Sequence, residues 1–122
     1  MASIDELSQR IETLDGYIAS ALTDHTSGMT LSSHSVTDFD IELAAAAGTE
    51  VVRAQFRAIE HMGGGQKIQD ILITLDTQYH LIYMSPREDF HGLFAYLVLD
   101  RARGNLALAR RWLTQASEVA EM

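Results

Sequence analysis

The segment HMGGGQK, from His61 to Lys67, is the part of the sequence that most resembles a phosphate-binding loop. Such a loop holds phosphate with backbone N–H groups when a strand precedes it and a helix follows, because the helix N-terminus adds partial positive charge. Here apolar residues at helical spacing precede the glycines, a β-rich segment follows them, and Lys67 is not followed by Ser or Thr. We therefore predict a glycine-rich helix end and no nucleotide site.

The other chemically versatile residues show no spacing that predicts catalysis. The sequence has no cysteine, its five histidines form no H-E-x-x-H pair, and it contains no G-x-S-x-G motif. We expect no enzyme activity, no catalytic residues, no cofactor and no metal. Four arginines surround the start of the last predicted helix, and we interpret them as exposed charges, although they would also suit an anion: Arg101, Arg103, Arg110 and Arg111.

Composition limits the class of protein and its partners. At 122 residues with 47% hydrophobic content, the chain suits a single domain over residues 1–122. Nine basic and 17 acidic side chains give a net charge of −8, which repels nucleic acid and anionic membranes. No apolar run reaches the length of a membrane span, and the N-terminus lacks the pattern of a secretory signal. We expect a cytoplasmic protein with no membrane insertion and no nucleic-acid partner.

Hydrophobic periodicity predicts the order α-β-β-α-β-β-β-α. A capping box from Ser3 to Glu6 begins a helix that Gly16 ends, Asp38 is the predicted cap of a long helix that continues to about Met62, and Asn105 caps the last helix. The predicted strands are Tyr17 to Thr23, Met29 to Ser33, Lys67 to Leu75, Tyr79 to Ser85 and Gly92 to Leu99. Because the last strand is apolar on both faces, we expect it at the centre of a sheet covered by helices on both sides.

The long helix has more apolar surface than one packing face requires. Its predicted polar stripe is narrow and contains Glu42, Thr49, Glu50, Arg53, Arg57 and Glu60. One apolar surface would cover the sheet, and the small residues from Ala44 to Gly48 would admit a second helix from another copy. The alternative to a dimer is that the whole helix is deeply buried within one protomer. An exposed edge strand containing Ile71 and Ile73 would favour the dimer.

Over nearly its full length the chain resembles the Roadblock/dynein light chain domain family, a profilin-like relative of the longin fold. The resemblance lies in Gly16 before the first strand, the hairpin glycine Gly28, and the segments DIELAAAAG, DILITL and LFAYLVLDRARGNLALARRWL. It implies an α+β sandwich with a five-stranded antiparallel sheet, the long helix on one face and the terminal helices on the other.

The resemblance also implies a homodimer, with third strands paired antiparallel and long helices side by side. The residues carried over to this interface are Ala44, Ala47, Gly48, Val51, Val52, Gln55, Ile59, Asp70, Ile71, Leu72, Ile73 and Leu75. Arg53 and Arg57 are candidate contacts for a small GTPase, although a solvated stripe explains them equally well. Gln55 would hydrogen-bond either across the dimer axis or to a partner within the chain.

Members of the family generally lack an active site and serve as platforms for Ras-like small GTPases, as their regulators, or as dynein-associated adaptors. The leading hypothesis is therefore a noncatalytic homodimeric regulator or scaffold of a Ras-like small GTPase in signalling, polarity or motility. One alternative is a small-molecule sensing domain of the PAS or GAF type, which an apolar pocket between sheet and helix would favour. A dynein-type structural adaptor is another.

Overall fold

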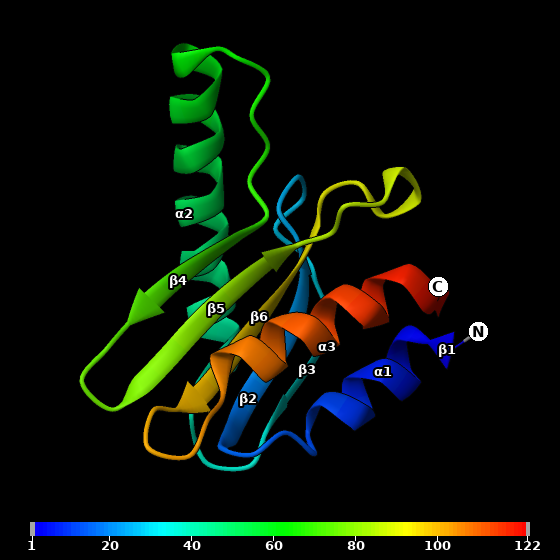
Figure 1. Ribbon diagram of the computed structural model, residues 1–122, viewed down its shortest axis with the longest axis vertical. Coiled ribbons are helices and arrows are strands. Elements are labelled where there is room, and N and C mark those ends of the chain that lie inside the picture. Colours follow the sequence, from blue (N-terminus) through cyan, green and yellow to red (C-terminus); the bar gives the residue numbers. More distant parts are fainter. Residues whose placement is uncertain (1, 122) are drawn as a thin grey trace.

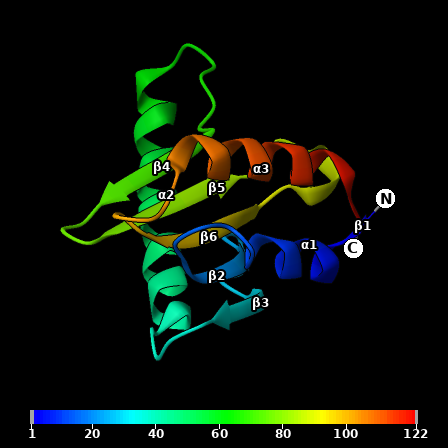
Figure 2. The same ribbon diagram turned by 60° about the horizontal axis from the view of Figure 1, so that its bottom comes forward.

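The chain folds into three layers around an antiparallel sheet, as Figure 1 shows for the computed structural model, which describes residues 2–121. The sheet has five strands in the order β3-β2-β6-β5-β4. One long helix, α2, crosses one face, whereas α1 and α3 cover the other (Figure 2). The predicted α+β class and the positions of the three helices are confirmed.

The order of the elements is the predicted one, although the first helix ends at Ile11 and not near Gly16, and the third strand of the main sheet begins at Asp70 and not at Lys67. The helices are α1 (Ile4–Ile11), α2 (Ile41–Met62) and α3 (Leu106–Val119), with a short 3-10 helix, η1 (Glu88–Phe90). The strands of the main sheet are β2 (Tyr17–Asp24), β3 (Thr30–Ser35), β4 (Asp70–Thr74), β5 (Gln78–Met84) and β6 (Leu93–Asp100). The additional strands β1 (Ala2–Ser3) and β7 (Ala120–Glu121) pair in parallel and join the two ends of the chain. Strands of two residues have no periodicity from which to predict them.

Side-chain caps fix where the helices begin. Ser3 Oγ accepts the Glu6 N–H at 3.2 Å and Asn105 Oδ1 accepts the Leu108 N–H at 3.0 Å, which confirms both predicted caps. The predicted cap of α2 is wrong: Asp40 Oδ1, not Asp38, accepts the Leu43 N–H at 3.1 Å. The reason is a preceding turn in which the Phe39 N–H donates to Thr37 Oγ1, so that the helix begins only at Ile41.

The glycine run ends α2, as predicted. Gly63, Gly64 and Gly65 have φ angles of 72°, 82° and 68°, in a region that residues with a Cβ rarely adopt. The run leads out of a helix and into β4, so it lacks the following helix that a phosphate-binding loop requires.

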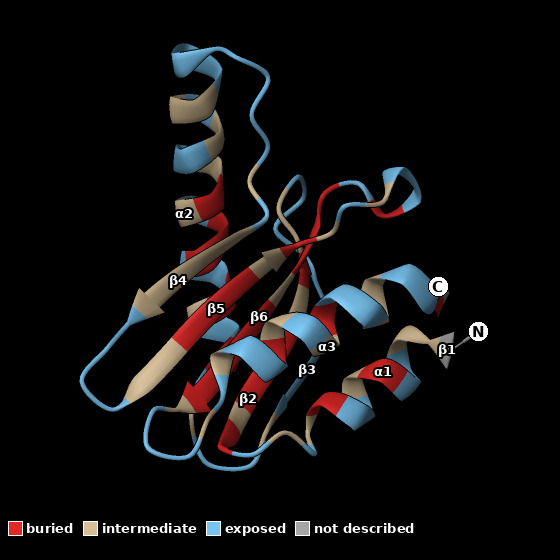
Figure 3. Ribbon diagram, viewed as in Figure 1, coloured by how far each residue is buried: buried red, intermediate tan, exposed pale blue. Residues whose placement is uncertain are grey.

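Strand β6 lies at the centre of the sheet and its two faces contribute to two cores. Towards α2, Tyr96 and Val98 pack in a cluster with Ala45 and Val52, while towards α3, Leu97 and Leu99 pack with Leu113 and other residues. Figure 3 shows the buried residues concentrated along β6, β5 and β2. The predicted central strand with helices on both sides is confirmed.

Gly48 allows α2 to approach the sheet closely. A Cβ added at Gly48 would lie 2.9 Å from two ring carbons of Tyr96, closer than real Cβ atoms come. The Tyr96 side chain is buried, 4% exposed, so its ring has little room to move. An added side chain at this position would therefore require α2 or the Tyr96 ring to move.

The last turns of α2 extend beyond the sheet. A helix of 22 residues is about 33 Å long, and Figures 1 and 2 show its last turns passing the ends of the strands, with the loop that follows running back beside them. Met62, its last residue, is 75% exposed. Among residues 2–121, no helix has the length and apolar content needed to cross a membrane.

Candidate functional site

The outward surface of α2 carries an apolar seam that nothing in the protomer covers completely. We define the α2 seam as Ala44, Ala47, Val51, Ala54 and Ala58, each half-buried or exposed. Their alternating spacing of three and four residues places them along one line of the helix, as in helices that pack side by side. Leu43, 68% exposed, and Met62 extend the apolar surface towards the two ends. The seam has the geometry for contact with another helix.

The residues predicted for a helix pair divide between two faces of α2. Ala44, Ala47 and Val51 belong to the seam, Gln55 is exposed beside it, and Ile59 is half-buried. The assignment of Gly48 and Val52 to the helix pair is corrected, because both residues face the sheet of their own protomer. Val52 is 0% exposed. The prediction did not assign Ala54 and Ala58 to the interface, although the spacing from Ala47 already marks them.

Thr49 also differs from the prediction, which placed it in the polar stripe. It is 4% exposed, and its Oγ1 donates to the Ala45 carbonyl at 3.1 Å. A threonine can satisfy its hydroxyl within its own helix, which removes the need for solvent. The solvated stripe of α2 is therefore narrower than predicted.

Strand β4 forms one edge of the sheet, as expected, and pairs only with β5 among the described strands. Arg110 of α3 donates two hydrogen bonds to the Asp70 carboxylate, at 3.0 and 3.1 Å. Arg101 donates to the Leu75 carbonyl at 2.9 Å. The interpretation of these two arginines as merely exposed charges is wrong, because both hold β4 or the residue that follows it. Arg103 and Arg111 are exposed.

The two candidate GTPase contacts have different environments. Arg53 Nε donates to the His25 carbonyl at 2.9 Å, and its Nη2 donates to the Thr26 carbonyl at 3.4 Å, so this side chain supports the β2–β3 turn. Arg57 is exposed, and among the described residues no ion pair involves it. Arg57 is therefore the better placed of the two for an external contact.

A buried polar network lies beneath α2. The Tyr96 hydroxyl is 2.6 Å from His80 Nδ1, and His80 Nε2 is 2.9 Å from Gln78 Oε1. Because the amide oxygen only accepts, Nε2 carries the proton and Nδ1 accepts from Tyr96. Burial lowers the pKa of His80 and raises the pKa of Tyr96 to about 12, which keeps both groups neutral near pH 7.

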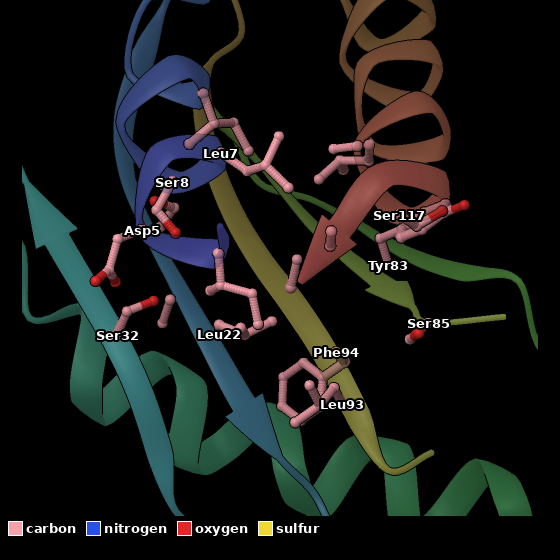
Figure 4. Close-up of a pocket in the computed structure, with 18 of the residues that line it drawn as sticks. Asp5, Leu7, Ser8, Leu22, Ser32, Tyr83, Ser85, Leu93, Phe94 and Ser117 are labelled. Carbon is pink, nitrogen blue, oxygen red and sulfur yellow. The ribbon is translucent and has the colours of Figure 1, made fainter. Parts of the chain in front are cut away.

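On the opposite face of the sheet, α1 and α3 leave a cavity of about 490 Å³ between them. We call it the interhelical pocket. Figure 4 shows Leu7 of α1, Leu22 of β2, and Leu93 and Phe94 of β6 around its middle. Trp112 and Ala116 of α3 also line it. The sequence did not predict this pocket, but it is the observation that would favour a sensing domain.

One rim of the pocket holds a connected polar cluster. Ser20 and His34 line the pocket, and the Tyr17 hydroxyl lies 2.7 Å from Ser20 Oγ and 3.3 Å from His34 Nδ1. Glu12 Oε1 lies 2.5 Å from His34 Nδ1. Burial, with the Glu12 charge as a smaller cause, raises the pKa of Tyr17, while the Ser20 hydrogen bond opposes the shift. Tyr17 is therefore a neutral hydrogen-bonding group at this rim.

The described residues contain no cluster of side chains suited to binding a metal ion. No group of three or more His, Cys, Asp or Glu side chains gathers among them in positions suited to one ion. The surfaces that the geometry offers are the apolar seam of α2, the open edge of β4, and the cavity between α1 and α3.

Solved structures share the fold of this chain. A Roadblock/LC7 domain from Streptomyces avermitilis matches with a TM-score of 0.78 and 14% identity, covering 96% of this chain and 93% of that one. MglB from Myxococcus xanthus matches with a TM-score of 0.79 and 16% identity, covering 94% and 82%. An MglB with a tetrameric arrangement matches with a TM-score of 0.76 and 14% identity, covering 93% and 82%. No family model and no curated protein sequence matches the chain significantly.

These likenesses confirm the Roadblock resemblance at the level of the fold. The matches extend over nearly the whole chain, so the fold is shared from α1 to α3. Sequence identity of this size establishes architecture, and the partners must be argued from this chain's own surfaces.

Proposed function

We propose that this chain, which has the Roadblock/LC7 fold, is a noncatalytic homodimeric regulator or scaffold of a Ras-like small GTPase. In this proposal it acts in the cytoplasm as one domain over residues 1–122. The observation that carries the proposal is the α2 seam, an apolar helix surface that the described residues of the protomer cover only in part. The open edge of β4 supports it, because that strand offers unpaired backbone groups to a twofold mate. The tetrameric MglB shows that a protein of this fold assembles.

Pairing through these surfaces would create one broad platform from two protomers. The small side chains of the seam would allow two helices to approach closely, and antiparallel pairing of β4 would join the two sheets. A GTPase bound across such a platform would change nucleotide state only if the platform favoured one switch conformation over the other. Arg57 is the basic residue of α2 that we propose for this contact.

The dimer is tested by measuring mass in solution. We expect light scattering after size exclusion to give a dimer at micromolar concentration. Ala54→Glu places a charge in the seam and should give monomers, because a buried unpaired charge opposes association. Ala46→Glu is the matched control, since Ala46 is exposed on α2 but lies outside the seam, and it should remain dimeric. A wild-type protein that is monomeric at this concentration contradicts the dimer.

The GTPase is tested by pull-down from host lysate with GDP in one arm and a nonhydrolysable GTP analogue in the other. We expect a small GTPase to be retained preferentially in one nucleotide state. Arg57→Ala should reduce its recovery about tenfold, as for loss of a charged interface contact. Arg111→Ala removes an exposed charge from α3 and should leave recovery unchanged. Recovery of no GTPase in either arm would refute this function.

The interhelical pocket favours a second candidate function, a small-molecule sensing domain. Its volume and mostly apolar walls match those of ligand-binding sites in general. The test is denaturing extraction of the purified protein followed by mass spectrometry. A co-purified small molecule in near-stoichiometric amount would support sensing, whereas protein that neither retains a molecule nor binds one on addition would leave only the scaffold.

A further inference from the structure

The walls of the interhelical pocket favour an aliphatic ligand. Leu7 and Leu93 are each 8% exposed and Phe94 is 1% exposed, so the middle of the pocket is apolar and fixed by packing. Leu22 and Ala116 extend this surface towards the rims. A hydrocarbon chain removes water from such a surface and gains free energy in proportion to the area buried.

The polar groups at the two rims differ. Figure 4 shows Asp5, Ser8 and Ser32 on the side of α1 and β3, and Tyr83, Ser85 and Ser117 on the side of α3 and β5. Glu12, which caps the C-terminal end of α1, also lines the pocket, and its carboxylate lies 2.5 Å from His34 Nδ1. No lysine or arginine lines the pocket among the described residues. The α1 rim therefore carries hydroxyl acceptors and the Asp5 carboxylate, for which the described residues form no ion pair, whereas the Glu12 carboxylate is paired with His34.

We infer that the interhelical pocket binds a single-chain aliphatic amine, with the hydrocarbon tail among the leucines and the ammonium group at the α1 rim near Asp5. A cationic head complements the Asp5 carboxylate and the net charge of −8, both of which oppose an anionic head. Serine hydroxyls at the same rim accept the remaining N–H donors of an ammonium group. This inference names the ligand class of the sensing candidate and does not depend on the GTPase.

Trp112 provides a direct reporter of binding. It is the only tryptophan of the chain and it lines the pocket. Decylamine, decanol, decanoate and ethylamine are titrated separately at concentrations below micelle formation. We expect decylamine to change Trp112 fluorescence saturably with one molecule per chain, and to bind about tenfold more tightly than decanoate. Ethylamine has no tail and should give no saturable change.

Two pairs of variants connect binding to the pocket. Ala116→Phe fills it and should abolish the decylamine response, whereas Ala107→Phe places the same side chain on the exposed side of α3 and should leave it unchanged. Asp5→Asn should reduce the preference for decylamine over decanoate about threefold to fivefold. Glu118→Gln, an exposed carboxylate of α3 outside the pocket, should leave that preference intact. If Ala116→Phe lowers the melting temperature strongly, Ala116→Leu replaces it.

Three results would overturn the inference. Binding of decylamine by the occluded variant as tightly as by the wild type would place the ligand elsewhere. If decanoate or decanol bound as tightly as decylamine, the ammonium group would not contribute to binding, and an amine would not be the preferred ligand. Absence of binding by all four probes would reject the aliphatic class, while a different molecule extracted from the purified protein would still support sensing. The nucleotide-dependent pull-down is independent of each of these results.

Discussion

Gly48 is a residue of α2 at which an added methyl group would meet a buried aromatic ring. We expect Gly48→Ala to destabilise the protein by about 1 to 2 kcal/mol, because strain from overpacking exceeds the gain of about 1 kcal/mol in helix propensity. The Tyr96 ring must shift to admit the Cβ, and it is held by the hydrogen bond to His80. Chemical denaturation measures the change.

The matched control for Gly48 is Ala46→Val. Ala46 is exposed on the same helix, so the variant adds carbon atoms without a contact to the sheet. A loss of about 0.5 kcal/mol is expected from helix propensity alone. A Gly48→Ala variant as stable as the wild type would show that α2 does not depend on this close approach.

His80 makes stability depend on pH. Burial lowers its pKa in the folded state below the ordinary value of 6.5, so the unfolded chain binds a proton more readily. The free energy of unfolding should therefore be greatest above about pH 6.5 and should fall as the pH drops from there through the lowered pKa. We expect His80→Gln to make this dependence shallower in denaturation curves measured from pH 7.5 to pH 5.

The dependence will not vanish in the His80 variant, because desolvation also lowers the pKa of His25. His61→Gln is the control for replacing a histidine by glutamine, since His61 is exposed at the end of α2. A His80→Gln curve with the wild-type slope would show that His80 does not titrate with unfolding.

Single residues were predictable where a local rule decides their role. Ser3, Asn105 and the glycines after Met62 act within one turn of helix or loop, and the sequence contains that whole environment. Thr49 was misplaced because a helical wheel gives angles but not the direction of the sheet. Gly48 and Val52 were carried over from the family resemblance, which does not show which residues of this helix face its own sheet. Only the packed structure shows which side of α2 faces inward.

At the scale of elements, the Arg110–Asp70 ion pair joins α3 to edge strand β4. The side chains are 40% and 22% exposed, so solvent weakens the attraction, although the geometry is bidentate. We expect Asp70→Asn to destabilise the protein by no more than about 1 kcal/mol at low salt, and by less in about 1 M NaCl. Denaturation at the two salt concentrations measures both values.

A double-mutant cycle with Arg110→Gln separates the pair from other effects of the substitutions. Glu50→Gln is the control, because Glu50 lies in an exposed pair with Arg53 at 3.5 Å and should contribute almost nothing. A coupling energy of zero between Asp70 and Arg110 would mean that the pair does not hold β4.

Elements were predictable in order because each has its own hydrophobic period. Strand β6 reads as a continuous apolar run and lies at the centre, and α2 shows the helical period over its whole length. The interhelical pocket was not predictable, since a cavity is the space left where α1, α3 and the sheet pack incompletely. Each of its wall residues also suits a filled core.

For the whole molecule, the net charge of −8 opposes the dimer that we propose. Two acidic protomers repel one another, and dissolved salt screens that repulsion within about 10 Å at 0.1 M. We expect the dimer dissociation constant to fall about threefold or more between roughly 20 mM and 200 mM NaCl. Sedimentation equilibrium at the two concentrations measures it. A dimer that weakens with salt would instead indicate an interface held by ion pairs.

The parallel pairing of β1 with β7 places Ala2 and Ser3 beside Ala120 and Glu121, so that a short linker could connect the two ends. In the natural order, the central pair of the sheet joins residues far apart in sequence, such as Ala21 and Tyr96. A circular permutant that links the two ends and opens the chain at Gly64 would bring β6 and β2 closer along the chain while keeping every strand pair. Folding rates rise as contacts become more local, so we expect stopped-flow refolding of the permutant to be faster than that of the natural order.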